Sequence, residues 1–232
     1  MGKMFKSVTA TWNPATGCEH GCIYCYARIL AEGRLRNLDR YKDGFEAVKL
    51  HEKEFIRTFQ PGELVFVVDM GDLFGSWVKE AWIQRVIQHI NQFPLTDFLF
   101  LTKNPMRYRG FTFPSNAILG VTLETDDYNY QEITKAPSPL ERYRDFVDIS
   151  HPRKFVSIEP IMEIQDVHRF LEWMRFIKPE LIEVGADNYG FKLPEPSPRQ
   201  LEYLLGKLRE ICPKVVEKDG LDRLHGEKRI NK

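Results

Sequence analysis

The sequence predicts an α/β fold in which parallel strands alternate with helices. Along the 232 residues, short apolar runs alternate with longer stretches whose apolar residues recur every three or four positions. The runs at 64–68 and 98–101 are continuously apolar, as expected for parallel strands that helices cover. About six strand–helix units can be counted, which is too few for the usual closed barrel of eight. We therefore expect a parallel sheet with right-handed crossovers.

Six strands are expected, together with a weaker seventh. They are 7–12, 63–69, 97–102, 117–123, 154–159 and 181–185, with 214–217 as the seventh. Amphipathic helices are predicted at 79–93, 167–178 and 198–212, the last of them ended by Pro213. The apolar faces of these helices are interpreted as core.

The composition indicates one soluble globular domain over residues 1–232. Hydrophobic residues make up 43% and charged residues 28% of the chain, and the formal net charge is +0. This balance argues against a protein that works mainly by coating nucleic acid. The first residues lack the apolar core of a signal peptide, and no apolar run approaches the length of a membrane span. With clustered cysteines that need reduced thiols, a cytoplasmic protein without a membrane partner is expected.

Three of the four cysteines lie within eight residues, as Cys18, Cys22 and Cys25 in the spacing C-x3-C-x2-C. We name residues 17–25 the cluster loop. Thiolates select zinc, copper(I) or iron–sulfur clusters, and three protein ligands leave one position open for chemistry. Two alternatives compete with an iron–sulfur site: a zinc site completed by His20 or His51, and ordinary buried cysteines.

The residues around these cysteines resemble a known family. Thr-Trp-Asn-Pro at 11–14 and Gly-Cys-Glu-His-Gly-Cys-Ile-Tyr-Cys-Tyr-Ala-Arg at 17–28 resemble the cluster loop of radical S-adenosylmethionine (SAM) enzymes. Within that superfamily they look most like the branch of spore photoproduct lyase, including a related phage-encoded family of unknown function. The resemblance implies an open, partial (β/α)6 TIM-like barrel. The composition of segment 34–61, with apolar residues at helical spacing over 45–59, suggests an elaboration of the first helix rather than a separate domain, and 213–232 is expected to be a C-terminal extension.

The resemblance also implies a chemistry. Three thiolates would hold a [4Fe–4S] cluster whose fourth iron binds SAM. An electron from a donor such as flavodoxin or ferredoxin would cleave SAM to a 5′-deoxyadenosyl radical, which abstracts hydrogen from a substrate. The enzyme would be of the lyase or modification type.

Polar residues follow five of the expected strands, where the chemistry of parallel barrels collects. For these positions the resemblance suggests the following roles. The turn Met70-Gly71-Asp72 would receive the SAM ammonium, Thr122 and Glu124 the ribose, and Ser157 and Glu159 would make further SAM contacts. Gly185 would approach the adenine, Lys103 would pair with the SAM carboxylate or a substrate phosphate, and Tyr24 would precede an adenine contact. Each residue alone also fits a helix cap, a solvated charge or an ion pair.

Cys212 lies outside the cluster loop. In the lyase branch a cysteine donates hydrogen, so Cys212 is a candidate hydrogen donor; the alternative is a small buried residue at a helix end.

A nucleic-acid substrate is one hypothesis. Basic residues could form a phosphate-binding surface or simply be solvated; they are Arg34, Arg36, Arg40, Lys42, Lys218, Arg223, His225, Lys228, Arg229 and Lys232. A small-molecule or peptide substrate is the second hypothesis. A non-catalytic zinc- or iron–sulfur-binding module that docks a partner is the alternative from another class.

Overall fold

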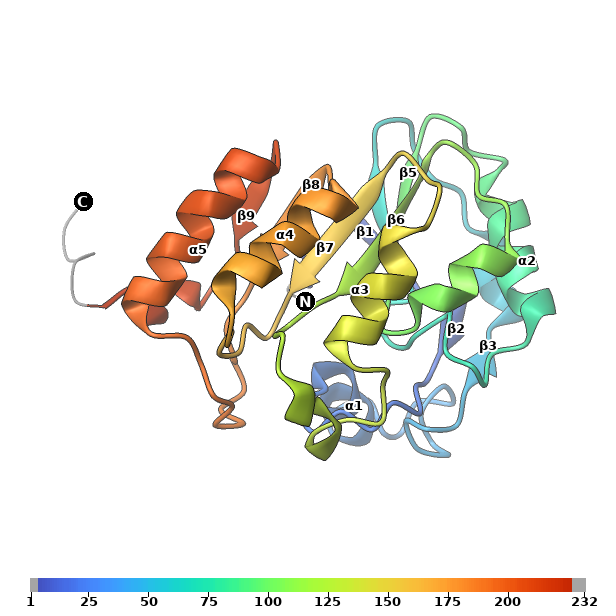
Figure 1. Ribbon diagram of the computed structural model, residues 1–232. Coiled ribbons are helices and arrows are strands. Elements are labelled where there is room, and N and C mark those ends of the chain that lie inside the picture. Colours follow the sequence, from blue (N-terminus) through green and yellow to red (C-terminus); the bar gives the residue numbers. More distant parts are fainter. Residues whose placement is uncertain (1–3, 227–232) are drawn as a thin grey trace.

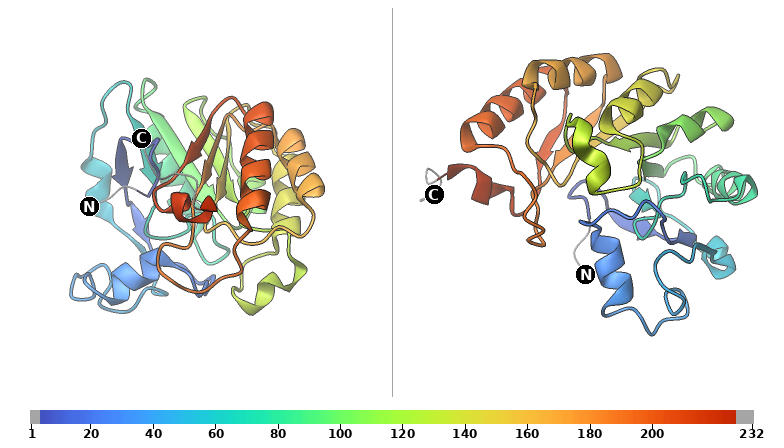
Figure 2. Two further views of the ribbon diagram at one scale, coloured as in Figure 1. Left: turned by 90° about the vertical axis from the view of Figure 1, so that its left-hand side faces the viewer. Right: turned by 60° about the horizontal axis from the view of Figure 1, so that its bottom comes forward.

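The computed structural model describes residues 4–226. Seven parallel strands form one sheet that curls into half of a barrel (Figures 1 and 2). They are β1 (Ala10–Trp12), β4 (Leu64–Val67), β5 (Asp97–Thr102), β6 (Ala117–Thr122), β7 (Lys154–Ile158), β8 (Leu181–Val184) and β9 (Val215–Glu217). Each pairs with the next strand of this series in parallel. The predicted partial barrel is confirmed, and the weaker seventh strand is part of it.

Helices cover the convex side of the sheet, as Figure 2 shows. They are α2 (Glu80–Ile90), α3 (Pro139–Val147), α4 (Val167–Ile177) and α5 (Pro198–Ile211), while α1 (Tyr26–Glu32) follows the cluster loop. Four 3-10 helices are η1 (Glu52–Ile56), η2 (Pro105–Gly110), η3 (Tyr128–Glu132) and η4 (Leu221–Leu224). The predictions for α2, α4 and α5 are confirmed to within three residues. Helix α3 was not predicted, although its capping box, Ser138 with Glu141, is visible in the sequence.

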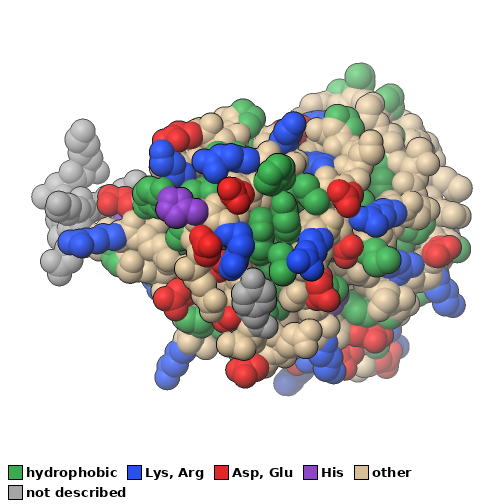
Figure 3. All heavy atoms as spheres, viewed as in Figure 1, with side chains coloured by type: hydrophobic (Ala, Val, Ile, Leu, Met, Phe, Trp, Pro, Cys, Tyr) green, Lys and Arg blue, Asp and Glu red, His purple; other side chains and the backbone are tan. Residues whose placement is uncertain are grey.

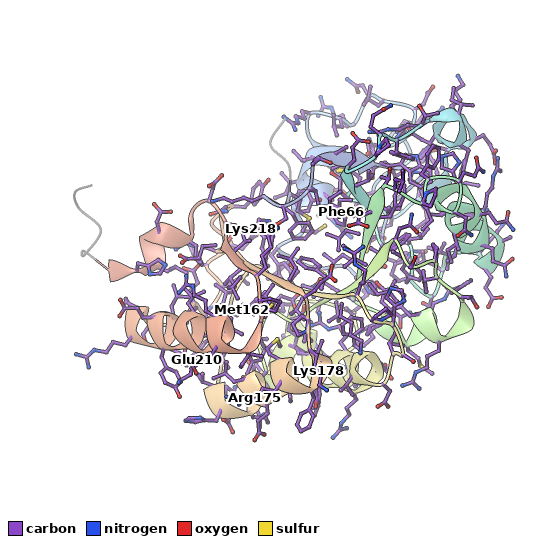
Figure 4. All side chains as sticks on the ribbon, turned by 90° about the horizontal axis from the view of Figure 1, so that it is seen from above. Phe66, Met162, Arg175, Lys178, Glu210 and Lys218 are labelled. Atoms are coloured by element: carbon purple, nitrogen blue, oxygen red, sulfur yellow. The ribbon has the colours of Figure 1, made fainter. Side chains whose placement is uncertain are left out.

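The two faces of the sheet carry separate apolar layers. Val65 and Val67 of β4 face the helices, whereas Phe66 between them faces the concave side. The concave layer also holds Leu99, Ile118, Phe155 and Leu181 from the following strands. In Figure 4, Phe66 and Lys218 lie within the curve of the sheet, while Arg175 and Glu210 lie on the outer helices.

The N-terminal segment 4–8 fills the concave side. Phe5 is fully buried and makes edge contacts with Phe66 and Phe155 at centroid distances of 4.9 and 5.1 Å. The buried carboxylate of Glu183 in β8 accepts the amides of Lys6 at 3.1 Å and Ser7 at 3.0 Å. A strand was expected from residue 7, but β1 begins at Ala10. The difference arises because the Ser7 amide binds Glu183 instead of a neighbouring strand.

Segment 34–61 forms turns, the short strand β3 (Lys49–Leu50) and η1. Strand β3 pairs antiparallel with β2 (Ala15–Thr16), which precedes the cluster loop. The helical spacing of apolar residues over 45–59 therefore does not produce an α-helix, because part of this stretch is used for strand pairing. No helix within residues 4–226 is both long and apolar enough to cross a membrane.

Candidate functional site

The cluster loop begins where two glycines cross at the carboxyl edge of the sheet. Gly17 and Gly71 form a parallel bridge, in which Gly17 N donates to Met70 O at 2.9 Å. The amide of Asp72 donates back to Gly17 O at 3.4 Å. A Cβ at Gly71 would lie 2.7 Å from the Gly17 oxygen, so only glycine permits this approach. The turn expected to receive an ammonium group thus uses the Met70 carbonyl and the Asp72 amide to hold the cluster loop.

The three cysteines of the loop line one cavity of about 930 Å³. Cys22 is buried, whereas Cys18 and Cys25 are half-buried. Cys25 also caps α1, because its Sγ accepts the amide of Arg28 at 3.4 Å. The loop turns tightly between the last two cysteines, with Cys25 N donating to Cys22 O at 3.2 Å. The structure therefore brings the three predicted ligands to the same cavity.

The chemistry of these donors fits an iron–sulfur cluster. Burial raises the pKa of Cys18, and the charge of Asp72 raises it further; burial also raises the pKa of Cys25. Such thiols keep their protons until a metal displaces them. Within residues 4–226, no three His, Cys, Asp or Glu side chains converge as ligands of one ion. A cluster of several irons has a different requirement, since each thiolate binds its own iron.

His20, between the first two cysteines, is tied to the end of β4. Its Nε2 lies 2.8 Å from Asp72 Oδ2, and both side chains are buried. The His20 ring also meets Trp77 edge-on, with the centroids 4.8 Å apart. His20 lines the cavity, but its Nε2 is already committed to the carboxylate.

The Asp72 carboxylate is a hydrogen-bond hub. Its Oδ2 accepts Thr102 Oγ1 at 2.9 Å and Lys103 N at 3.0 Å, besides His20 Nε2. Its Oδ1 accepts Phe74 N at 2.9 Å. Burial alone would raise the pKa of Asp72, but these hydrogen bonds, with His20 first, hold it below its usual value. The ionised Asp72 carboxylate thus links the cluster loop to the connections that follow β4 and β5.

Beside the cysteines lies a buried network around Glu124, which is fully buried. Arg142 Nη2 donates to Glu124 Oε2 at 2.9 Å, and Lys103 pairs with Oε1. The hydroxyls of Tyr24 and Tyr130 donate to the same Oε1 at 2.9 and 2.7 Å. Glu124 was expected to bind a ribose, but the structure places it behind Tyr24 and Lys103, which themselves line the cavity.

Electrostatics in this network make Lys103 easier to deprotonate than an ordinary lysine. Two cations, Lys103 and Arg142, share the single carboxylate of Glu124. Burial, followed by repulsion from Arg142, lowers the pKa of Lys103 to about 7. Burial raises the pKa of Tyr130 to about 12, so its hydroxyl remains a donor.

The candidates on β6 and β7 differ in their access to the cavity. Thr122 lines the cavity, and its carbonyl accepts Arg142. Ser157 follows Phe155 by two residues on the concave face and is fully buried. Its Oγ has no hydrogen-bond partner among the described residues. Ser157 is not among the residues that line the cavity, so its hydroxyl does not reach the cavity in this structure.

The side chain of Glu159 packs directly against the backbone of Gly185. Glu159 lines the cavity and pairs with Lys218, which follows β9; burial raises the pKa of Glu159 despite this lysine. A Cβ at Gly185 would lie 2.5 Å from Glu159 Oε1. In this structure the missing side chain of Gly185 therefore makes room for Glu159, whereas the sequence suggested room for an adenine.

Cys212 lies away from the cavity. It follows α5 and is buried in the core between sheet and helices. Its Sγ lies 3.2 Å from Pro179 O and 3.3 Å from Lys214 O, and its single S–H can donate to either carbonyl. Those two carbonyls precede β8 and β9, so Cys212 sits at the amino edge of the sheet, opposite the cluster loop. The structure does not bring Cys212 to the other candidates, and its thiol does not line the cavity.

Several cavity residues were given no role by the sequence analysis. Asp69, after β4, lines the cavity; burial raises its pKa, and Asn13 Nδ2 donates to it at 2.5 Å. The backbone before it is strained, since Val68 has φ +61°. Tyr189 and Phe191 follow β8 at the mouth, with centroids 6.2 Å apart. The length of the 185–197 connection after a barrel strand is the sequence signal that could have indicated Tyr189 and Phe191.

Within residues 4–226, the candidate basic residues are mostly taken up in ion pairs. The pairs are Arg40 with Glu54, Lys42 with Asp39, Lys218 with Glu159, Arg223 with Glu195 and His225 with Glu217. On the face in Figure 3, positive and negative side chains are interspersed. Arg34 is exposed and borders the cavity. Lys228, Arg229 and Lys232 lie outside the described residues.

Residues 4–177 match a family described as "Protein of unknown function (DUF5131)". No curated protein matches the sequence.

Solved structures of spore photoproduct lyase are similar. A cysteine-to-serine mutant has a TM-score of 0.59 at 12% identity, covering 92% of this chain and 78% of that one. A tyrosine-to-phenylalanine mutant has 0.54 at 12% identity, covering 87% and 74%. A double mutant with bound AdoMet and dinucleoside spore photoproduct has 0.51 at 13% identity, covering 87% and 61%. At these identities the likeness shows the fold.

Proposed function

The chain belongs to the DUF5131 family of proteins of unknown function, and we propose that it is a radical SAM enzyme. In this proposal Cys18, Cys22 and Cys25 bind a [4Fe–4S] cluster, and SAM is cleaved reductively to a 5′-deoxyadenosyl radical that abstracts hydrogen from a substrate. The observation that carries it is the position of the cysteines, which line a cavity of about 930 Å³ at the carboxyl edge of a half-barrel.

The chain's own residues would hold and shield the cofactors. The cavity is large enough for a nucleoside-sized cosubstrate together with part of a substrate. Phe66, Met70 and Leu101 give it apolar walls that limit water. Asp69 and Thr122, which line the cavity, are the polar groups that we assign to SAM. Lys103, Glu124 and Tyr24 would form a fixed wall behind it.

For the substrate we propose a nucleic acid whose base enters the mouth of the cavity. Tyr189 and Phe191 border this mouth, and aromatic side chains there can stack on a base. The exposed Arg34 and Lys6 also line the cavity, where they can meet phosphates, although Lys6 is paired with Asp219 at 2.8 Å. The neutral net charge and the interspersed surface charges favour local contacts over an extended phosphate-binding face. A peptide or small molecule is the competing substrate class.

Anaerobic reconstitution tests the cluster. We expect four irons and four sulfides per chain, and an electron paramagnetic resonance (EPR) signal of the reduced cluster that changes when SAM is added. Cys22→Ala should lose the signal, whereas Cys212→Ala should keep it. One zinc per chain without SAM binding would instead support the non-catalytic binding module and contradict the proposal.

Binding of single-stranded oligonucleotides tests the substrate class. We expect Tyr189→Ala to weaken binding by about 1–3 kcal/mol, the usual contribution of base stacking on an aromatic ring. The exposed Tyr203 on α5 is the matched control, and Tyr203→Ala should leave binding unchanged. Equal affinity of both variants and the wild type would argue for the other substrate class.

A further inference from the structure

Thr134 brings a hydroxyl to one of the cluster cysteines. Its Oγ1 lies 3.0 Å from Cys22 Sγ, and both side chains are buried. Thr134 comes from the connection between η3 and α3, far from the cluster loop in sequence. This connection is fixed against the loop, because Ile23 N donates to Ile133 O at 3.0 Å and Lys135 N donates to His20 O at 2.7 Å.

The hydroxyl of Thr134 has a choice of acceptors. Its oxygen accepts Ala136 N at 3.1 Å and lies 3.0 Å from His20 O as well as from Cys22 Sγ. A hydroxyl carries one hydrogen, which can go to only one of these two acceptors at a time. When Cys22 is a thiol, its S–H can donate to Thr134 and the hydroxyl hydrogen can go to His20 O.

An iron-bound sulfur changes this arrangement. It carries no proton and can only accept a hydrogen bond. The His20 carbonyl keeps its bond from the Lys135 amide whichever way the hydroxyl turns. The hydroxyl hydrogen can therefore turn to Cys22 Sγ without leaving a buried carbonyl unpaired.

We propose that Thr134 donates a hydrogen bond to Cys22 Sγ in the cluster-loaded protein and thereby makes the reduction potential of the cluster less negative. The inference rests on the proposed function. One-electron reduction adds negative charge to the cluster, and a hydrogen bond to a ligand sulfur stabilises that added charge. Cys25 Sγ already accepts a hydrogen bond from the Arg28 amide, which any residue there except proline would supply. Thr134 is thus a tuning residue whose effect depends on its side chain.

Redox titration of the reconstituted protein, followed by EPR, tests this role. Thr134→Val keeps the shape of the side chain without the hydroxyl, and Thr134→Ser keeps the hydroxyl. We expect Thr134→Val to shift the midpoint to a more negative potential, and Thr134→Ser to stay near the wild type. A merely structural role would lower iron content or stability without this split between the two variants. Thr134→Ala serves as a second variant without a hydroxyl if Thr134→Val fails to fold.

Two outcomes would overturn the proposal, and they can be told apart. Equal midpoints for wild type, Thr134→Val and Thr134→Ala, each with four irons per chain, would overturn the role of Thr134 and leave the enzyme function intact. A wild-type protein that binds no iron–sulfur cluster would overturn both.

Discussion

His20 Nε2 and Asp72 Oδ2 lie 2.8 Å apart in the interior, joining the cluster loop to the end of β4. The same carboxylate accepts the Thr102 hydroxyl and the Lys103 amide of β5 and its connection. One ionised side chain therefore sets the position of the cysteine loop relative to two strands.

Asp72→Ala should destabilise the protein by about 3–5 kcal/mol, because it leaves His20 and three further buried donors without their acceptor. Asp72→Asn keeps one acceptor oxygen and should cost less. Urea unfolding followed by circular dichroism measures both. Equal, small losses for the two variants would mean that this carboxylate does not hold the site together.

Lys103 should make stability depend on pH. Its pKa is lowered to about 7, whereas in an unfolded chain it is about 10.4. Between these values the unfolded state binds more protons than the native state, so stability should rise with pH. The wild type should gain roughly 1 kcal/mol per pH unit relative to Lys103→Met between pH 7 and 9.

The measurement is urea unfolding of wild type and Lys103→Met at several pH values. A difference that stays constant from pH 6 to pH 9 would contradict the prediction. It would mean that Glu124 keeps Lys103 charged over this whole pH range. Burial and the neighbouring Arg142 would then not lower the pKa of Lys103.

Phe5→Ala should destabilise the protein by about 3–5 kcal/mol, because Phe5 is fully buried against Phe66 and Phe155. Phe5→Leu keeps much of the volume and should cost less. Calorimetric melting of both variants gives the comparison. A melting temperature of Phe5→Ala close to the wild type would show that segment 4–8 does not fill the concave side in solution.

The sheet could be predicted from the sequence because its signal is local. Strands such as β5 and β6 are covered on both faces, so they appear as continuous apolar runs of the right length. The cluster loop is local for the same reason, since its three ligands lie within eight residues.

The rest of the site depends on contacts distant in sequence. Thr134 and Arg142 come from the region after β6 and meet Cys22 and Glu124 only in the folded chain. No spacing in the sequence indicates that Glu124 would be enclosed by Arg142 and two tyrosines, or that Glu183 would hold the N-terminal segment. The expected role of Glu124 was based on its place after a strand, which does not tell whether a side chain faces the cavity.

Cys212 is expected to be a core residue, unlike the three cysteines proposed to bind the cluster. Since its thiol lies in the core at the amino edge of the sheet, Cys212→Ala should leave iron content and SAM cleavage as in the wild type. Iron analysis and a SAM-cleavage assay measure this. Loss of cleavage with the cluster intact would restore Cys212 as a candidate for hydrogen transfer.

The most direct test of the radical SAM proposal is the formation of 5′-deoxyadenosine. The anaerobically reconstituted protein is incubated with SAM and dithionite, and the products are quantified by liquid chromatography and mass spectrometry. We expect 5′-deoxyadenosine and methionine from the wild type and none from Cys22→Ala. A wild-type protein that carries four irons per chain and releases no 5′-deoxyadenosine, even with candidate nucleic acids present, would contradict the account.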